Sequence, residues 1–261
     1  MTRIHAKKMP MILVLLAATA AGWADQPQHP AVSQSTVELR EAEEDYQRGV
    51  RAADGIGVPQ DYTAAAKYYR KAAECGHIAA QYNLAFLYEN GLGVKQDFAE
   101  AAAWYRKAAD QGDPESQNNL GVLYTTGKGV PLDFTEAVRL YSLAAAQEDL
   151  EGTANLASMY LQARGVARDT ARAFQLFTKA AQRGYSVAQN NLALMYANGE
   201  SVKRDYVKAY AWLDLAAADL PNAAMVRDAL AKEMTPAQLG QARQFAAQKR
   251  KELGDKEGKI Q

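Results

Sequence analysis

The chain has 261 residues, with 30 lysines and arginines against 30 aspartates and glutamates, and 48% of its residues are hydrophobic. This composition is typical of a soluble globular protein, and it excludes a disordered polymer, a collagen and a multispan membrane protein. A net charge of zero argues against a broad basic surface for nucleic acid. The single cysteine, Cys75, cannot form a disulfide within the chain.

Residues 1–24 have the plan of a secretory signal peptide. Basic residues precede an apolar run at residues 9–21, and small residues lead to a cleavage site after Ala24. The run is short for a bilayer span of roughly 20 residues, although an uncleaved N-terminal anchor stays open as the alternative. We therefore predict a periplasmic or secreted protein with no transmembrane segment in its mature chain.

Polar segments flank the rest of the sequence. Residues 25–40 contain prolines and small polar residues without an apolar period, which predicts a flexible lead-in. Residues 254–261 are also polar and predict a disordered tail.

A period of 36 residues organises the chain between these segments. Aspartate recurs at this step without a slip, and alanine, leucine, tyrosine and asparagine positions keep the same step. The aspartate ladder is Asp61, Asp97, Asp133, Asp169 and Asp205, and the asparagine ladder is Asn83, Asn119, Asn155 and Asn191. Residues 41–221 thus divide into five units, at about 42–77, 78–113, 114–149, 150–185 and 186–221.

Each unit is expected to form two helices. In the second unit, Leu84 and Tyr88 lie on one apolar stripe, and glycines after residue 90 end that helix. Asp97 is the predicted N-cap of the next helix, and Glu100 completes a capping box. Because one hairpin cannot bury its own apolar face, stacking of the five is predicted.

The fourth unit departs from the pattern, and a further segment follows the fifth. Ala163 and Glu148 replace turn glycines in the fourth unit, which leaves a distorted turn there as an open expectation. A helix start signal at Thr235 falls within residues 222–253, which are predicted to be a helical cap on the last repeat. The predicted fold is an all-α, right-handed α-solenoid of about five 36-residue helical hairpins with a C-terminal capping helix pair.

The spacing of Leu84, Tyr88, Gly91, Asp97 and Trp104 resembles a Sel1-like repeat, which is a relative of the tetratricopeptide repeats. The resemblance covers about residues 42–220. It implies that the first helix of each hairpin lines a concave groove, with the asparagine ladder near that face.

No set of residues for catalysis is recognisable. Cys75 and His77 lie two residues apart, but a nucleophile pair also needs an orienting group and a cleft. The mature sequence has no Ser-x-x-Lys motif of a serine β-lactamase, and its glycine pairs lack the ending of a P-loop. We predict that the protein is not an enzyme and has no metal site and no cofactor.

Candidate partner-binding residues follow from the resemblance, which places them along the groove, although large side chains such as Tyr82 and Phe86 more often fill the core between helices. They are Tyr82, Asn83, Phe86, Asn118, Asn119, Val122, Asn155, Asn190, Asn191 and Leu194. An asparagine side chain can donate and accept, so the ladder can track a peptide backbone. The other interpretation, given equal weight, is that each asparagine bonds a neighbouring helix and only orders the stack.

These observations favour a periplasmic or secreted adaptor or scaffold that binds another protein or peptide in its groove, for example an envelope sensor or an assembly component. Two alternatives stay open. The family resemblance suggests a hydrolase-like protein acting on β-lactams or the cell wall. A solenoid can also cap a secreted toxin as an immunity protein.

Overall fold

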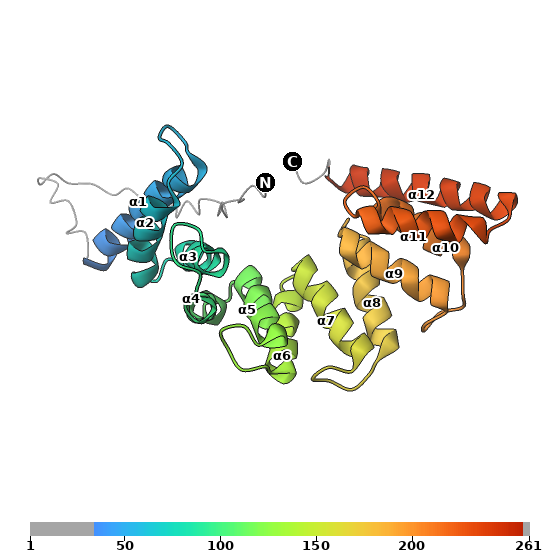
Figure 1. The fold of residues 1–261 in the computed structure, drawn as a ribbon, viewed down its shortest axis with the longest axis horizontal. Coiled ribbons are helices and arrows are strands. Elements are labelled where there is room, and N and C mark those ends of the chain that lie inside the picture. Colours follow the sequence, from blue (N-terminus) through green and yellow to red (C-terminus); the bar gives the residue numbers. More distant parts are fainter. Residues whose placement is uncertain (1–33, 258–261) are drawn as a thin grey trace, which may run out of the picture. The chain divides into compact units, whose positions relative to one another are not determined.

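The computed structural model describes residues 34–257, in which every regular element is an α-helix (Figure 1). Helices α1 to α10 form five successive hairpins, and α11 with α12 forms a sixth. Their bounds are α1 Gln34–Asp54, α2 Tyr62–Glu74, α3 Ile78–Asn90, α4 Phe98–Asp110, α5 Pro114–Thr126, α6 Phe134–Ala146, α7 Leu150–Gln162, α8 Thr170–Ala181, α9 Ser186–Asn198, α10 Tyr206–Ala216, α11 Pro221–Lys232 and α12 Pro236–Glu257. The predicted all-α solenoid is confirmed.

The helices belong to two compact units. Unit 1 comprises the described residues up to Ser116 together with Lys128–Val130, and unit 2 comprises Gln117–Gly127 and the described residues from Pro131 onward. In unit 1, α2 packs against both α1 and α3, and α3 packs against α4. In unit 2, the same nearest-neighbour order runs from α6 to α10, and α10 also contacts α11 and α12. Within each unit, successive hairpins thus bury their apolar faces against one another.

Two helices extend further than the sequence predicted. Helix α1 begins at Gln34, inside the predicted lead-in, and α12 continues to Glu257, inside the predicted tail. Pairs one helical turn apart, such as Arg40 with Glu44 at 3.8 Å, favour the helix over this polar sequence. The predicted signal peptide, residues 1–24, lies outside the described residues.

The aspartate ladder caps the second helix of each hairpin. In α2, α4 and α6, one carboxylate oxygen of Asp61, Asp97 or Asp133 accepts two backbone N–H groups at 2.9–3.1 Å. The predicted capping box at Asp97 is only half formed, because the backbone N–H of Asp97 donates to the carbonyl of Tyr88. The Glu100 carboxylate instead accepts from Nε1 of Trp104 at 3.3 Å.

In the second, third and fourth repeats, the second glycine of the turn sets the approach of the repeat to the previous one. A Cβ on Gly93 would lie 2.2 Å from the carbonyl carbon of Tyr62, at the start of α2. Gly129 and Gly165 make the same approach to Phe98 and Phe134. The turns therefore rest on the first residue of the preceding second helix, a contact that only glycine allows at this distance.

Two positions beside the fourth repeat's first helix keep the left-handed turn conformation without glycine. Ala163 has φ +55° and Glu148 has φ +65°, both in the left-handed region where other repeats have glycine. Met159 accepts the backbone N–H of Ala163, in the same way that Leu87 accepts that of Gly91. The turn geometry is thus preserved, and these two side chains carry the backbone strain.

Small residues and aromatic rings share the core. Ala65, Ala101, Ala137, Ala173 and Ala209 have no exposed surface, and Tyr69, Tyr105, Tyr141 and Phe177 are buried. A Cβ on Gly121 would lie 2.7 Å from the ring of Tyr141, so the glycine makes room for that ring. Alternation of small and large side chains fills the space between helices.

The C-terminal hairpin is held on α10 by one carboxylate. Asp214 pairs with Arg227 of α11, with a shortest distance of 2.9 Å, and also with Arg250 of α12. Met234, between α11 and α12, is buried against Tyr210 and Ala242. This hairpin covers the end of the repeat array in unit 2.

Candidate partner-binding surface

The asparagine ladder makes a direct contact between repeats in unit 2. Nδ2 of Asn155 on α7 donates to Oδ1 of Asn118 on α5, at 2.8 Å. Nδ2 of Asn118 donates to Glu151 at 3.1 Å and to Asn119 at 3.3 Å. Asn118, the centre of this network, is 2% exposed, whereas Asn119 and Asn155 are half-buried and Glu151 is exposed. At Asn155 the amide orders the repeats.

The first asparagine of the ladder is buried in unit 1. Asn83 is 4% exposed, and it lies near the hydroxyl groups of Tyr46 and Tyr69, which come from α1 and α2. Burial raises the pKa of Tyr46 to about 12, the Glu43 carboxylate adds to the rise, and Asn83 opposes it. Nδ2 of Asn83 makes no hydrogen bond of normal geometry. Its burial removes this amide from any surface that a partner contacts.

The last asparagine of the ladder has no partner in the preceding repeat. The residue 37 positions before Asn155 is Asn118, whereas the residue 37 positions before Asn191 is Ala154, which has no polar side-chain atom. Nδ2 of Asn191 donates to the carbonyl of Val187 in its own helix, at 3.0 Å. The amide of Asn191 is half-buried and lies at the helix surface.

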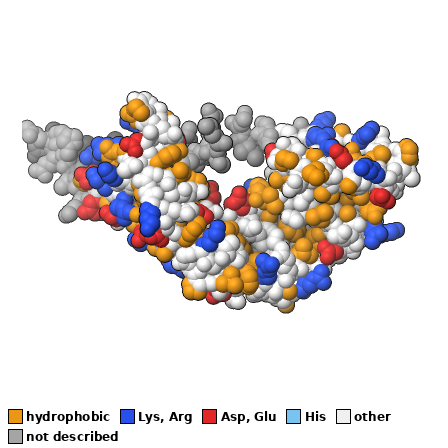
Figure 2. Space-filling model, viewed as in Figure 1, with side chains coloured by type: hydrophobic (Ala, Val, Ile, Leu, Met, Phe, Trp, Pro, Cys, Tyr) orange, Lys and Arg blue, Asp and Glu red, His pale blue; other side chains and the backbone are white. Residues whose placement is uncertain are grey.

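Four residues of α9 form a surface that we call the α9 stripe. Val187, Asn190, Asn191 and Leu194 are spaced i, i+3, i+4 and i+7, which places them on one face of the helix. Val187 is 40% exposed and Leu194 is 36% exposed, and the two asparagines between them are half-buried. Hydrophobic side chains gather over the α9 region in Figure 2. Sequence reasoning missed Val187, although the helical period alone would have added it.

The other predicted residues contribute mostly to packing. In unit 1, Tyr82 is half-buried and meets the ring of Tyr105 edge-on, with centroids 5.8 Å apart, and Phe86 is half-buried on the same helix. In unit 2, Val122 is half-buried against the core. The candidates thus fall into one group on α3 and a second group on α5, α7 and α9.

Negative charge lies beside the asparagine network in unit 2. Burial raises the pKa of Tyr185 to about 12, and the carboxylates of Glu151 and Asp149 add to the rise. Asp149 also caps α7, because its Oδ1 accepts the backbone N–H of Gly152 at 2.6 Å. Tyr185, directly before α9, therefore keeps its phenolic proton to a higher pH than a free tyrosine does, and its hydroxyl can donate a hydrogen bond.

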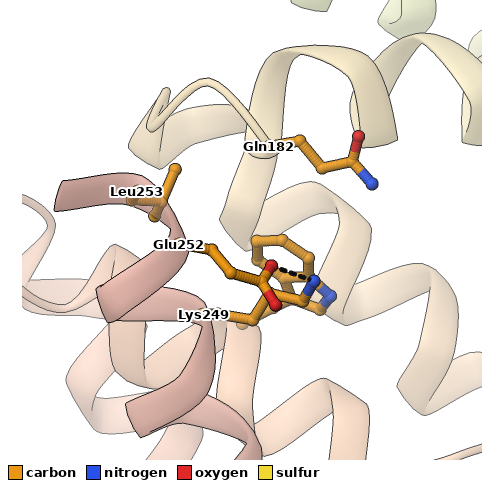
Figure 3. A pocket seen from close by; sticks show the side chains of 5 residues that line it. Gln182, Lys249, Glu252 and Leu253 are labelled. Carbon is orange, nitrogen blue, oxygen red and sulfur yellow. Dashed lines mark hydrogen bonds and ion pairs between the residues drawn. The ribbon is translucent and has the colours of Figure 1, made fainter. Parts of the chain in front are cut away.

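A pocket of about 160 Å³ lies between α8, α10 and α12 (Figure 3). Trp212 and Leu253 line it with Gln182, and Lys249 and Glu252 form an ion pair of 2.6 Å beside them. Sites for small ligands usually measure about 300–1,000 Å³, so this pocket is small for a cofactor or a substrate.

Cys75 and His77, the two residues considered above as a nucleophile pair, lie at the end of α2 and directly before α3. Cys75 is exposed at the end of α2. Nδ1 of His77 accepts the backbone N–H of Ala80 at 3.2 Å, and its Nε2 lies 3.0 Å from Glu43. Within residues 34–257, no three His, Cys, Asp or Glu side chains are grouped so that they could hold a metal ion. None of the helices in that range is both long and apolar enough to span a bilayer.

Comparisons with known proteins identify the repeat. The model of the Sel1 repeat family matches residues 46–77, 78–113, 114–149, 150–185 and 186–219. A search of curated proteins gives no match.

Solved structures show the same architecture. The chain is similar to c5321, a protective antigen of uropathogenic Escherichia coli strains with an SLR fold, at 33% identity and a TM-score of 0.78. That match covers 85% of this chain but only 48% of c5321, so the chain spans about half the length of that relative. A Sel1 repeat protein from Oxalobacter formigenes is 31% identical, with a TM-score of 0.65, over 72% of this chain and 76% of that one. Since the matched repeats occupy more than half of the sequence, the chain belongs to the Sel1 repeat family.

Proposed function

We propose that this Sel1 repeat protein is an exported adaptor that binds another protein through the α9 stripe. Sel1 repeats generally serve as scaffolds for protein–protein interaction, which supports the class of function. The observation that carries the proposal is the exposure of Val187 and Leu194 on either side of two amides, in a helix that otherwise packs into the core.

The chemistry of the stripe suits a polypeptide. The amides of Asn190 and Asn191 offer donors and acceptors to a peptide backbone, and neither is tied to another repeat by a bond like that of Asn155. Val187 and Leu194 supply apolar contacts one helical turn away on each side. A partner thus gains hydrogen bonds and apolar burial from the same helix face.

The proposed location rests on the sequence of residues 1–24. Their basic start, apolar run and small residues before Ala24 support export to the periplasm or beyond the cell. The partner is then an envelope protein, such as the external domain of a sensor or an assembly component. No enzymatic role is proposed.

The test compares two tagged variants expressed in the source organism. Val187→Asp with Leu194→Asp places charge on the α9 stripe, and Leu143→Asp with Met225→Asp changes two residues that are 41% and 70% exposed elsewhere in unit 2. Proteins that copurify with the wild type are quantified by mass spectrometry. The proposal expects a partner that the first variant loses and the second retains.

Circular dichroism of both variants provides the control for folding. Exposed positions tolerate charge, so both should unfold at nearly the wild-type temperature. Equal recovery of every copurifying protein by the two variants would rule out the α9 stripe as the binding surface.

A further inference from the structure

Basic side chains gather on the turns of the fourth and fifth repeats and on the first turns of α8 and α10. We call this set the basic edge. Its members are Arg164, Arg168, Arg172, Lys203, Arg204 and Lys208. All six lie in unit 2, and all except the half-buried Lys208 are exposed.

The two turns are in contact. Arg168 on the first turn pairs with Glu200 on the second at 3.4 Å. Ser201 occupies the position of the second turn glycine, and its hydroxyl lies 2.6 Å from that of Thr170 at the start of α8. The two turns that carry most of these cations therefore lie side by side, so their charges are brought near one another.

At one of these positions, the other repeats show that a positive charge is not needed for the fold. At the third residue of the second helix, α4 and α6 have Glu100 and Glu136, whereas α8 and α10 have Arg172 and Lys208. A carboxylate in the first turn is favoured by the helix dipole, and a cation there is disfavoured. At this position the fourth and fifth repeats thus carry a positive charge, which the helix dipole disfavours.

A second position shows the same replacement. Gln60 and Gln96 lie in the turns that follow α1 and α3. The side-chain amide of each donates to a backbone carbonyl of the preceding helix, that of Ala53 or Glu89. The equivalent residues in the fourth and fifth repeats are Arg168, whose Nε donates to the carbonyl of Leu161 at 3.3 Å, and Arg204, an exposed guanidinium. A neutral amide makes the same bond in the first two repeats, so the turn needs the hydrogen bond but not the positive charge.

The nearby carboxylates do not neutralise the edge. Asp169 and Asp205 cap α8 and α10 by accepting the backbone N–H groups of Arg172 and Lys208 at 2.8 and 3.0 Å. Asp205 also lies 3.4 Å from Nζ of Lys208. With Glu200, these make three carboxylates against six cations.

The remaining cations lack acidic partners in the described part of the chain. The guanidinium of Arg164 lies over the ring of Phe134 at 5.5 Å, and that of Arg172 contacts the amide oxygen of Gln175 at 3.4 Å. Lys203 and Arg204 are exposed. The edge therefore presents a local surplus of positive charge, although the whole chain has a net charge of zero.

We propose that the basic edge binds an acidic polypeptide segment of a partner. Four of its six cations are arginines, whose planar fork of donors matches a carboxylate in a bidentate contact. A membrane surface is less well suited, since stable binding to lipid usually adds apolar insertion. Neither of the two turns has a large hydrophobic side chain among those exposed in the described residues. The inference goes beyond the α9 stripe and uses none of its residues.

The probe is a fluorescein-labelled peptide of ten glutamates, and its binding to the purified protein is followed by fluorescence anisotropy. Arg172→Glu with Lys208→Glu restores the residue type of α4 and α6 and should weaken binding about tenfold at low salt. These substitutions follow the helix dipole, so the variant should melt no lower than the wild type. Lys67→Glu with Lys71→Glu makes the same charge change on α2 in unit 1 and should alter binding less than about twofold.

Three results would overturn the proposal. The wild type fails to bind the peptide even at about 50 mM salt, where screening is weak. Both variants lose binding equally, which would show a nonspecific effect of net charge. The protein binds vesicles of equal parts phosphatidylglycerol and phosphatidylcholine but not the peptide, which would assign the edge to lipid.

The α9 variant separates this proposal from the proposed function. Val187→Asp with Leu194→Asp should retain peptide binding, because both residues lie outside the basic edge. Loss of the copurifying partner together with retained peptide binding would show that the two surfaces act independently.

Discussion

Asn155 donates a 2.8 Å hydrogen bond to Asn118, the residue 37 positions earlier in the chain. The contact shows how one ladder can serve two purposes. Where the residue 37 positions earlier has an amide, asparagine links successive repeats. Where that residue is Ala154, Asn191 bonds its own helix, and its amide becomes available at the surface. For Asn155 and Asn191, the residue 37 positions earlier therefore decides whether the amide links two repeats.

Removal of the two asparagines should have unequal effects on stability. Asn155→Ala leaves the buried Oδ1 of Asn118 without its donor and should lower the free energy of unfolding by about 1–2 kcal/mol. Asn191→Ala removes a bond at the surface of one helix and should cost less than about 0.5 kcal/mol. Urea denaturation measures both, and equal losses would contradict the assignment.

A matched pair of glycine substitutions tests the docking of the turns. Gly93→Ala places a Cβ 2.2 Å from the backbone of Tyr62, whereas Gly57→Ala, at nearly the same φ, meets nothing within 4 Å. Both carry the strain of a left-handed alanine, about 1–2 kcal/mol. Only Gly93→Ala must also separate two repeats, so thermal unfolding should show a clearly larger loss for it. Similar melting temperatures would argue against close docking.

The fourth repeat offers a stabilising substitution. Ala163 has φ +55° at the end of α7, where Gly91 ends α3 with φ +66°. Ala163→Gly relieves the left-handed strain, partly offset by the greater freedom of glycine in the unfolded chain, and should stabilise by about 0.5–1 kcal/mol. The same change at buried Ala157, within α7, should destabilise by a similar or larger amount. Chemical denaturation of the two variants gives the comparison.

The tyrosines should make the fold sensitive to alkaline pH. The pKa of Tyr46 and that of Tyr185 are raised from 10 to about 12 in the folded protein. Between these values the unfolded chain loses its phenolic protons while the folded protein keeps them, so stability should fall as pH rises from 10 to 12. The loss of stability between pH 10 and 12 should be smaller in Tyr185→Phe, because that variant lacks one of the two phenolic protons. The absorbance of tyrosinate in the folded protein measures this ionisation. If every tyrosine ionised near pH 10, as free tyrosine does, the prediction would be contradicted.

Export can be checked on the protein itself. If the signal peptide is cleaved after Ala24, the protein recovered from the periplasm or the medium begins at Asp25. Intact mass spectrometry of that protein gives the answer directly. A full-length species confined to the membrane fraction would instead support an uncleaved anchor.

Much of the fold could be predicted from the sequence because the same pattern of capping and turn residues recurs in five repeats. The aspartate caps and turn glycines lie where the period places them. The extents of α1 and α12 were missed because their ends are polar and carry no apolar stripe to mark the helix; Arg40 and Glu44 form a charged pair near the start of α1.

The candidate surface was harder to predict. The sequence left two interpretations of the asparagine ladder, since it does not show which residue of the previous repeat faces each amide. Asn83 and Asn118 were included as surface residues, yet both are buried in the structure. The basic edge was missed because a net charge of zero conceals a local surplus in two repeats.

Site-specific photocrosslinking in living cells tests the central claim most directly. A photoreactive amino acid replaces Leu194 on the α9 stripe in one strain and the exposed Lys67 on α2 in another, and adducts are identified by mass spectrometry. The account predicts one specific protein adduct at position 194 that is absent at position 67. The same adducts at both positions, or none at position 194, would contradict a protein-binding role for the α9 stripe.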